Sequence, residues 1–181
     1  MEEVKLDKFK RLDLYNQYEI LKHLDKENCE HYEILQNIVA NGYEGEYGRL
    51  FEHIYNEIPS SLTDEVKDTF DMFRHMNFSY ENLTEEEEKD IDVSKLKWHG
   101  FDGNHEHEHF SAAHFYLNKL NLWEELGEHA INSHFTTRFY YPPMIGEWKK
   151  YGYGSMLTKE QIQLILNAPQ AAKKARESIN V

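Results

Sequence analysis

The sequence has almost no cysteine and no long apolar run. Cys29 is the only cysteine in 181 residues, which excludes an intramolecular disulfide framework and a cysteine-based zinc site. A lone thiol is typical of a reducing compartment, so we expect a cytoplasmic protein. The charged first residues contain no apolar stretch like that of a secretory signal. Because a membrane span needs about 20 apolar residues, we expect no membrane association.

Basic residues are also scarce, whereas aromatic residues are plentiful. The chain has 20 Lys and Arg against 33 Asp and Glu, which gives a formal net charge of -13. Binding to duplex DNA depends on clustered cations, so this composition disfavours duplex DNA as a partner. The 12 Tyr, 10 Phe and 3 Trp are spread through the chain. Because large rings often fill cores and subunit interfaces, we expect a homo-oligomer.

Helical periodicity dominates the chain, and strand signals are nearly absent. The apolar spacing predicts helices over about 6–24, 26–40, 49–56, 61–82, 105–126, 142–151 and 158–167. Gly42 is expected to end the second helix in a left-handed conformation, and Thr158 with Gln161 predicts a capping box. Residues 135–141 are predicted to be briefly extended. We therefore expect an all-α, multihelical single domain over 1–168 and a basic tail over 169–181, helical or frayed.

Several short strings occur together in an order that resembles one protein family. They are Asn16-Gln17-Tyr18, Asn41-Gly42-Tyr43, Gly100-Phe101-Asp102-Gly103-Asn104 followed by Glu106, and Pro143-Met144 with Trp148 and Tyr151. Over about residues 14–168 the chain resembles the YfbU family of small bacterial proteins. The resemblance implies an all-α, multihelical fold. It implies no catalytic residues, because the family has no agreed biochemical activity.

A run of alternating histidine and glutamate begins at His105. On a helix, His105 and His109 stand at i and i+4, the spacing at which two imidazoles can hold one metal ion. His114 or a carboxylate such as Asp102 could be a third ligand. The alternative is an exposed helix start, where glutamates are favoured by the helix dipole. The family resemblance implies no role for these imidazoles. We expect no cofactor, and a divalent metal serving a hydrolase is the alternative.

A second candidate pair is Arg49 with His53. Its spacing is reminiscent of the Arg-x(4 to 6)-His pair of HEPN-type ribonucleases, although only three residues separate the two side chains here. The acidic composition counts against an enzyme that acts on RNA. Because the spacing is similar, a HEPN-like ribonuclease that uses Arg49 and His53 is still kept as a second alternative.

Aromatic residues gather around Pro142-Pro143 and could line a ligand groove, although such clusters more often pack in a core. The candidate groove residues are Phe139, Tyr140, Tyr141, Met144, Trp148 and Tyr151. Together these features favour a non-enzymatic cytoplasmic protein that binds or regulates a protein or small-molecule partner.

Overall fold

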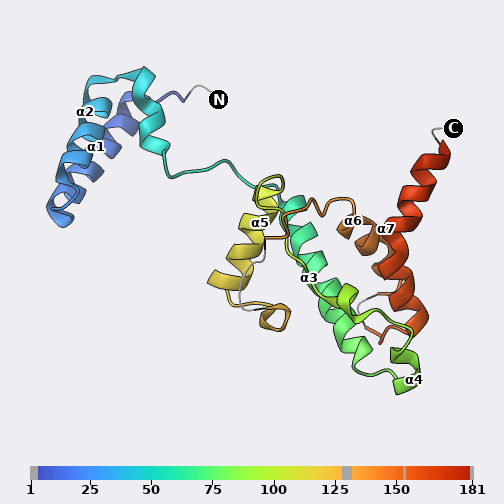
Figure 1. Ribbon diagram of the computed structural model, residues 1–181. Helices are drawn as coiled ribbons and strands as arrows, with labels where there is room; N and C mark the ends of the chain where they lie inside the picture. Colours follow the sequence, from blue (N-terminus) through green and yellow to red (C-terminus); the bar gives the residue numbers. More distant parts are fainter. Residues whose placement is uncertain (1–3, 128–131, 153, 180–181) are drawn as a thin grey trace. The chain divides into compact units, whose positions relative to one another are not determined.

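The computed structural model describes residues 4–127, 132–152 and 154–179, and its regular elements are helices (Figure 1). Within these residues there is no strand, only an isolated parallel bridge between Phe101 and Asn132. The predicted all-α, multihelical fold is confirmed. The chain divides into two compact units, Met1–Glu57 and Ile58–Val181, which we call unit 1 and unit 2. The proposed domain extent of 1–168 stays a prediction.

Unit 1 is a helical hairpin followed by a 3-10 helix. Helices α1 (Lys8–Leu24) and α2 (Cys29–Asn41) pack against each other, and η1 (Glu44–Phe51) follows them. Apolar residues at helical spacing on the two facing sides make a small core with one residue of η1. The buried core residues are Tyr18, Leu35, Ile38, Val39 and Tyr47.

The second helix ends where the sequence predicts. Gly42 has φ +69°, and the amides of Gly42 and Tyr43 both donate to the carbonyl of Ile38. Glycine takes this left-handed conformation without a Cβ clash. The helix predicted over 49–56 is wrong, because a tighter 3-10 helix begins at Glu44 and ends at Phe51.

Unit 2 is built around α3 (Ser60–Tyr80), which contacts most of the other elements of the unit. The elements that follow are α4 (Glu85–Glu88), η2 (Val93–Leu96), α5 (His107–His114), η3 (Phe115–Lys119), η4 (Glu124–Leu126), α6 (Tyr141–Trp148) and α7 (Lys159–Ile179). Figure 1 shows α6 lying beside the first half of α7. Fully buried rings of α3, of the segment after η2 and of α6 form one core, which includes Phe70, Phe73, Trp98, Phe101 and Trp148.

Two predicted elements of unit 2 differ from the structure. The helix predicted over 105–126 begins only at His107, becomes a π-helix at Phe115 and is interrupted before η4. Asn121 and Trp123 have positive φ values of 51° and 53°, which no helix continues through. Within the segment predicted to be extended, residues 138–140 form a turn and Tyr141 begins α6.

The last helix is longer than the predicted 158–167, because α7 continues through Pro169 to Ile179, so the tail expected to be helical or frayed is helical over its described residues. Its start agrees with the prediction: Thr158 and Gln161 exchange the two hydrogen bonds of a capping box. Proline removes one backbone hydrogen bond, but the alanine-rich stretch that follows has high helix propensity. In the described part of the chain, no helix is both long and apolar enough to cross a membrane.

Candidate functional site

Glu106 is the most heavily hydrogen-bonded side chain of the histidine run. It is 7 % exposed and accepts five hydrogen bonds, three from the amides of Asp102, Thr137 and Arg138 and two from the hydroxyls of Thr136 and Thr137. Burial favours a raised pKa, but these hydrogen bonds outweigh it and the pKa of Glu106 is lowered. The carboxylate therefore joins the loop before α5 to the turns before α6. Its role is structural.

The loop from Gly100 to Asn104 packs closely against Asn132. The Gly103 amide donates to the Asn132 side-chain oxygen at 3.2 Å, and a Cβ on Gly103 would lie 2.9 Å from its nitrogen. Gly100 has φ +90°. Gly100 and Gly103 belong to one of the short strings on which the family resemblance rests, and the loop needs both glycines for its conformation.

The structure does not bring the three candidate metal ligands together. His105 precedes α5, and its Nδ1 lies 2.6 Å from the buried carboxylate of Asp102. His109 is half-buried against Phe101, whereas His114 is exposed at the other end of α5. Within the described residues, no group of three His, Cys, Asp or Glu side chains is placed to hold a metal ion.

The second candidate pair is also not assembled. Arg49 lies in η1, where its Nε donates to Glu46 Oε2 at 2.7 Å, and His53 lies in the turn after η1. In a 3-10 helix, i and i+3 share a face rather than i and i+4. The two exposed side chains therefore do not form the helical pair that the spacing suggested.

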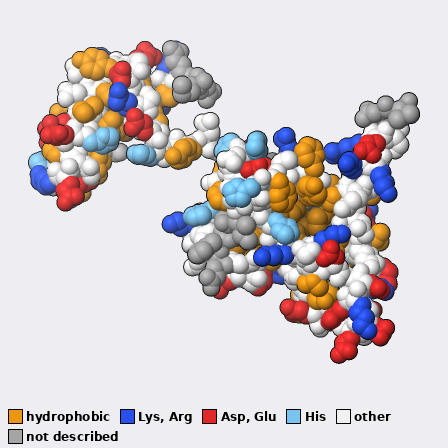
Figure 2. Space-filling view, in the orientation of Figure 1, with side chains coloured by type: hydrophobic (Ala, Val, Ile, Leu, Met, Phe, Trp, Pro, Cys, Tyr) orange, Lys and Arg blue, Asp and Glu red, His pale blue; other side chains and the backbone are white. Residues whose placement is uncertain are grey.

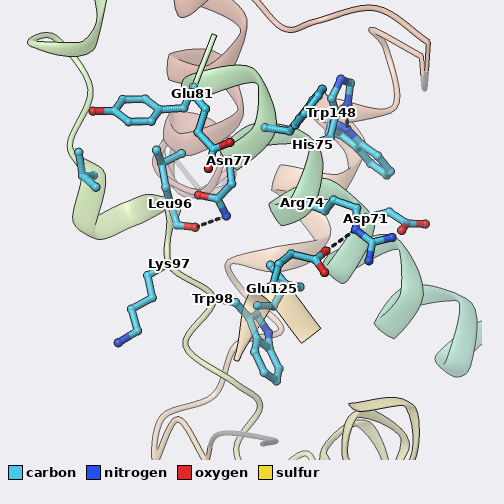
Figure 3. A pocket seen from close by; sticks show the side chains of 14 residues that line it. Asp71, Arg74, His75, Asn77, Glu81, Leu96, Lys97, Trp98, Glu125 and Trp148 are labelled. Carbon is cyan, nitrogen blue, oxygen red and sulfur yellow. Dashed lines mark hydrogen bonds and ion pairs between the residues drawn. The ribbon is translucent and has the colours of Figure 1, made fainter. Parts of the chain in front are cut away.

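A cavity with a volume of ≈ 960 Å³ lies beside α3 in unit 2 (Figure 3). Most of its polar side chains already bond to neighbours. Arg74 pairs with Glu125, and Asn77 donates to the carbonyl of Leu96, as the dashed lines in Figure 3 mark. These groups are occupied, whereas the buried Nε1 of Trp98 at the same cavity has no hydrogen-bond partner.

His75 and Trp98 at the same cavity are also engaged in packing. Trp148 Nε1 donates to His75 Nδ1 at 2.9 Å, and His75 Nε2 lies 2.9 Å from the carbonyl of Ser155. Because an indole only donates and a carbonyl only accepts, His75 is the neutral tautomer protonated at Nε2. The Trp98 ring turns away from the other labelled side chains toward the core, where it meets Phe70 edge-to-face. The cavity is a weaker candidate than its size suggests.

A more exposed candidate lies between the turns before α6 and the middle of α7. Two cavities of ≈ 490 and ≈ 270 Å³ share Tyr140, Pro169 and Gln170 in their walls, and we call them together the aromatic groove. Phe135, Phe139 and Tyr140 are 47 %, 51 % and 48 % exposed. Figure 2 shows apolar side chains gathered here, beside cationic side chains along α7. Such a cluster of half-exposed rings is typical of a binding surface.

One face of α7 forms a wall of the aromatic groove. Pro169, Ala172, Lys173 and Arg176 stand at i, i+3, i+4 and i+7 and all line the larger cavity. The smaller cavity reaches the core residues Phe73, Tyr141, Met144 and Leu166 and is also lined by Lys95 and His99. The groove thus combines an apolar floor with basic side chains.

Four of the six predicted groove residues line this groove: Phe139, Tyr140, Tyr141 and Met144. Trp148 instead borders the cavity beside α3, and Tyr151 donates to Glu147 at 2.6 Å. Sequence reasoning missed the α7 wall because it placed a tail after residue 168. The helical spacing of Pro169, Ala172, Lys173 and Arg176 was the available signal.

The chain is similar in sequence to known proteins over most of its length. The family model of the YfbU domain matches residues 4–168. A UPF0304 protein of Methanocaldococcus jannaschii is 31 % identical over 169 residues, which cover 90 % of this chain and 99 % of the relative. A UPF0304 protein of Actinobacillus succinogenes is 29 % identical over 160 residues, covering 87 % and 96 %. This chain belongs to the YfbU family.

Proposed function

We propose that this protein is a non-enzymatic cytoplasmic binding protein, and that its partner binds in the aromatic groove of unit 2. The observation that carries the proposal is the exposure of about half of each of three rings, Phe135, Phe139 and Tyr140, at two adjoining cavities. Aromatic anchors around a concave apolar surface dominate the energetics of many binding sites. The location in the cytoplasm rests on the single cysteine.

The contacts of Glu106, Arg49 and His105 favour binding over catalysis. The buried Glu106 carboxylate is surrounded by donors that belong to the loop it holds. Arg49 is engaged by Glu46, and His105 is held by Asp102. These side chains serve local structure, so the metal-dependent hydrolase and the HEPN-like ribonuclease have less support than a binding protein.

The predicted homo-oligomer stays a proposal, and we do not assign it to the aromatic groove. A symmetric dimer places the same patch of both copies face to face. Lys173 and Arg176 of one groove would then approach the same cations of the other, which opposes pairing. Self-association would use another surface.

The proposal is tested with anilinonaphthalene sulfonate, an apolar fluorescent dye that carries one negative charge. We expect saturable dye binding that the double variant Phe139→Ser/Tyr140→Ser weakens by about fivefold or more, because two anchor rings are lost. The matched control is Phe115→Ser/Leu120→Ser, which removes two side chains that are 50 % and 47 % exposed outside the groove. Circular dichroism checks that each variant is folded.

The control variant should bind the dye as the unchanged protein does. Equal binding by the groove variant and the control would place the dye elsewhere. The aromatic groove would then not be the binding surface, and the proposed function would fail.

A further inference from the structure

We infer that the occupant of the aromatic groove is an acidic amphipathic helix of a partner protein; this inference rests on the proposed function. Three observations carry it: the charge around the groove, the helix face that forms its wall, and the depth of its smaller cavity.

The charge at the groove is opposite in sign to that of the protein. The chain carries a formal net charge of -13, yet Lys95, Lys173 and Arg176 line the two cavities against one acidic lining residue, Glu177. Lys95 is paired with Asp92 at 3.9 Å, so Lys173 and Arg176 carry most of the local positive charge. Arg138 adds a cation 5.4 Å from the centre of the Phe139 ring. Local cations on an acidic surface favour an acidic partner and orient it.

The groove wall formed by α7 is shaped to receive a helix. Ala172 stands in the middle of the lining face of α7, and its small side chain allows another helix to approach at about the usual 8–10 Å. Lys173 and Arg176 flank this position at helical spacing, where Glu or Asp on a partner helix could pair with them. The described residues offer no strand edge, so β-strand addition is not available to the partner.

The smaller cavity is suited to an anchor side chain. It extends from the exposed ring of Phe135 down to Phe73, Tyr141 and Met144, which belong to the core. One large apolar side chain of the partner could bury itself there, and a second, one turn away, could lie against Phe139 in the larger cavity. Helical residues four apart are about 6 Å apart, which suits two adjoining cavities.

Most of the second half of α7 is exposed. Lys173, Lys174, Ala175 and Arg176 are all exposed, and Figure 1 shows this half extending beyond α6. An isolated helix of about ten residues is marginal in water, so a partner packed along it would add stability.

The test uses three 16-residue peptides labelled with fluorescein and the full-length protein. The first peptide is an amphipathic helix with Leu and Phe anchors four residues apart and Glu on both flanks. The second has Lys in place of each Glu, and the third has a central Pro that breaks the helix. Fluorescence anisotropy should show the first peptide binding about tenfold or more tightly than either other peptide, because the groove selects both charge and helix.

A charge reversal separates this inference from the proposed function. Lys173→Glu/Arg176→Glu should weaken the binding of the acidic peptide by about tenfold and strengthen the binding of the lysine peptide. The matched control is Lys119→Glu/Lys174→Glu, which makes the same change in charge at exposed positions that do not line the groove. The control should keep the original preference to within about twofold.

Each other outcome overturns the inference in a distinct way. Equal binding of the acidic and lysine peptides would end the acidic assignment, and equal binding of the proline peptide would end the helical one. Dye binding without peptide binding would support the proposed function and would show that the occupant of the groove is not such a helix. Sedimentation that shows a dimer lost in Phe139→Ser/Tyr140→Ser would make a second copy of this chain the occupant. If the groove variant bound the dye as its control does and the three peptides bound equally, the proposed function would fail as well.

Discussion

Glu106 holds together two parts of unit 2 that are about thirty residues apart in the chain. Its two carboxylate oxygens accept from the loop at Asp102 and from the turn at Thr136–Arg138. A carboxylate suits this position because it only accepts, and five donors converge on it. A neutral amide of the same size would turn two of its hydrogens toward those donors.

We expect Glu106→Gln to lower the free energy of unfolding by about 2–3 kcal/mol, because buried donors lose a charged acceptor. Urea denaturation followed by circular dichroism measures this change. Glu108→Gln is the matched control, since Glu108 is an exposed neighbour, and its effect should stay within about 0.5 kcal/mol. Equal midpoints for the two variants would contradict the structural role of Glu106.

Glu106 should also contribute to the pH dependence of stability. Its pKa in the folded protein lies below the ordinary value of 4.5, so the unfolded state binds the proton more tightly. The contribution is therefore fully present above that value and is lost as the pH falls through the folded pKa. Between about pH 5 and pH 3, the unchanged protein should lose more unfolding free energy than Glu106→Gln. Parallel pH profiles of the two proteins would refute this assignment.

At the scale of the element, the end of α2 depends on one backbone conformation. Gly42 has φ +69°, and its amide donates to Ile38 at 3.0 Å. A side chain in this conformation is strained, and a Cβ would also push against the guanidinium of Arg11.

Gly42→Ala should therefore destabilise unit 1 by about 1 kcal/mol, as measured by denaturant unfolding of the full chain. Gly48→Ala is the control, because Gly48 has no positive φ and a Cβ there meets nothing within 4 Å. If both substitutions had the same effect, the left-handed turn would not be what stabilises this helix end.

The helices show which elements can be predicted from sequence and which cannot. The ends at Gly42 and Thr158 were predicted because capping depends on residues within one turn. The helix expected over 105–126 failed because Trp123 is held in its positive φ by distant contacts. Its indole donates to Asp71 at 2.8 Å, and its ring packs on Phe70. The helix predicted over 158–167 continues past Pro169 into the tail that was expected to be helical or frayed.

At the scale of the whole molecule, charge sets the expected choice of partner. The net charge of -13 repels a polyanion, and the cations of the aromatic groove are too few to replace an extended counterion layer. We expect no complex with a 30-base-pair duplex DNA at about 150 mM salt in an electrophoretic mobility assay. The Lys119→Glu/Lys174→Glu variant should behave identically. A salt-sensitive shift with the unchanged protein would contradict this expectation.

The sequence by itself determined the helical class, the caps at Gly42 and Thr158 and the family, because these depend on spacing and on residues close in the chain. It also identified four aromatic-groove residues before α6 and within it. Only the tertiary structure decided that Glu106 is a buried acceptor, and that the far half of α7 supplies the other wall of the groove. Both depend on contacts between segments thirty or more residues apart, which local periodicity does not encode.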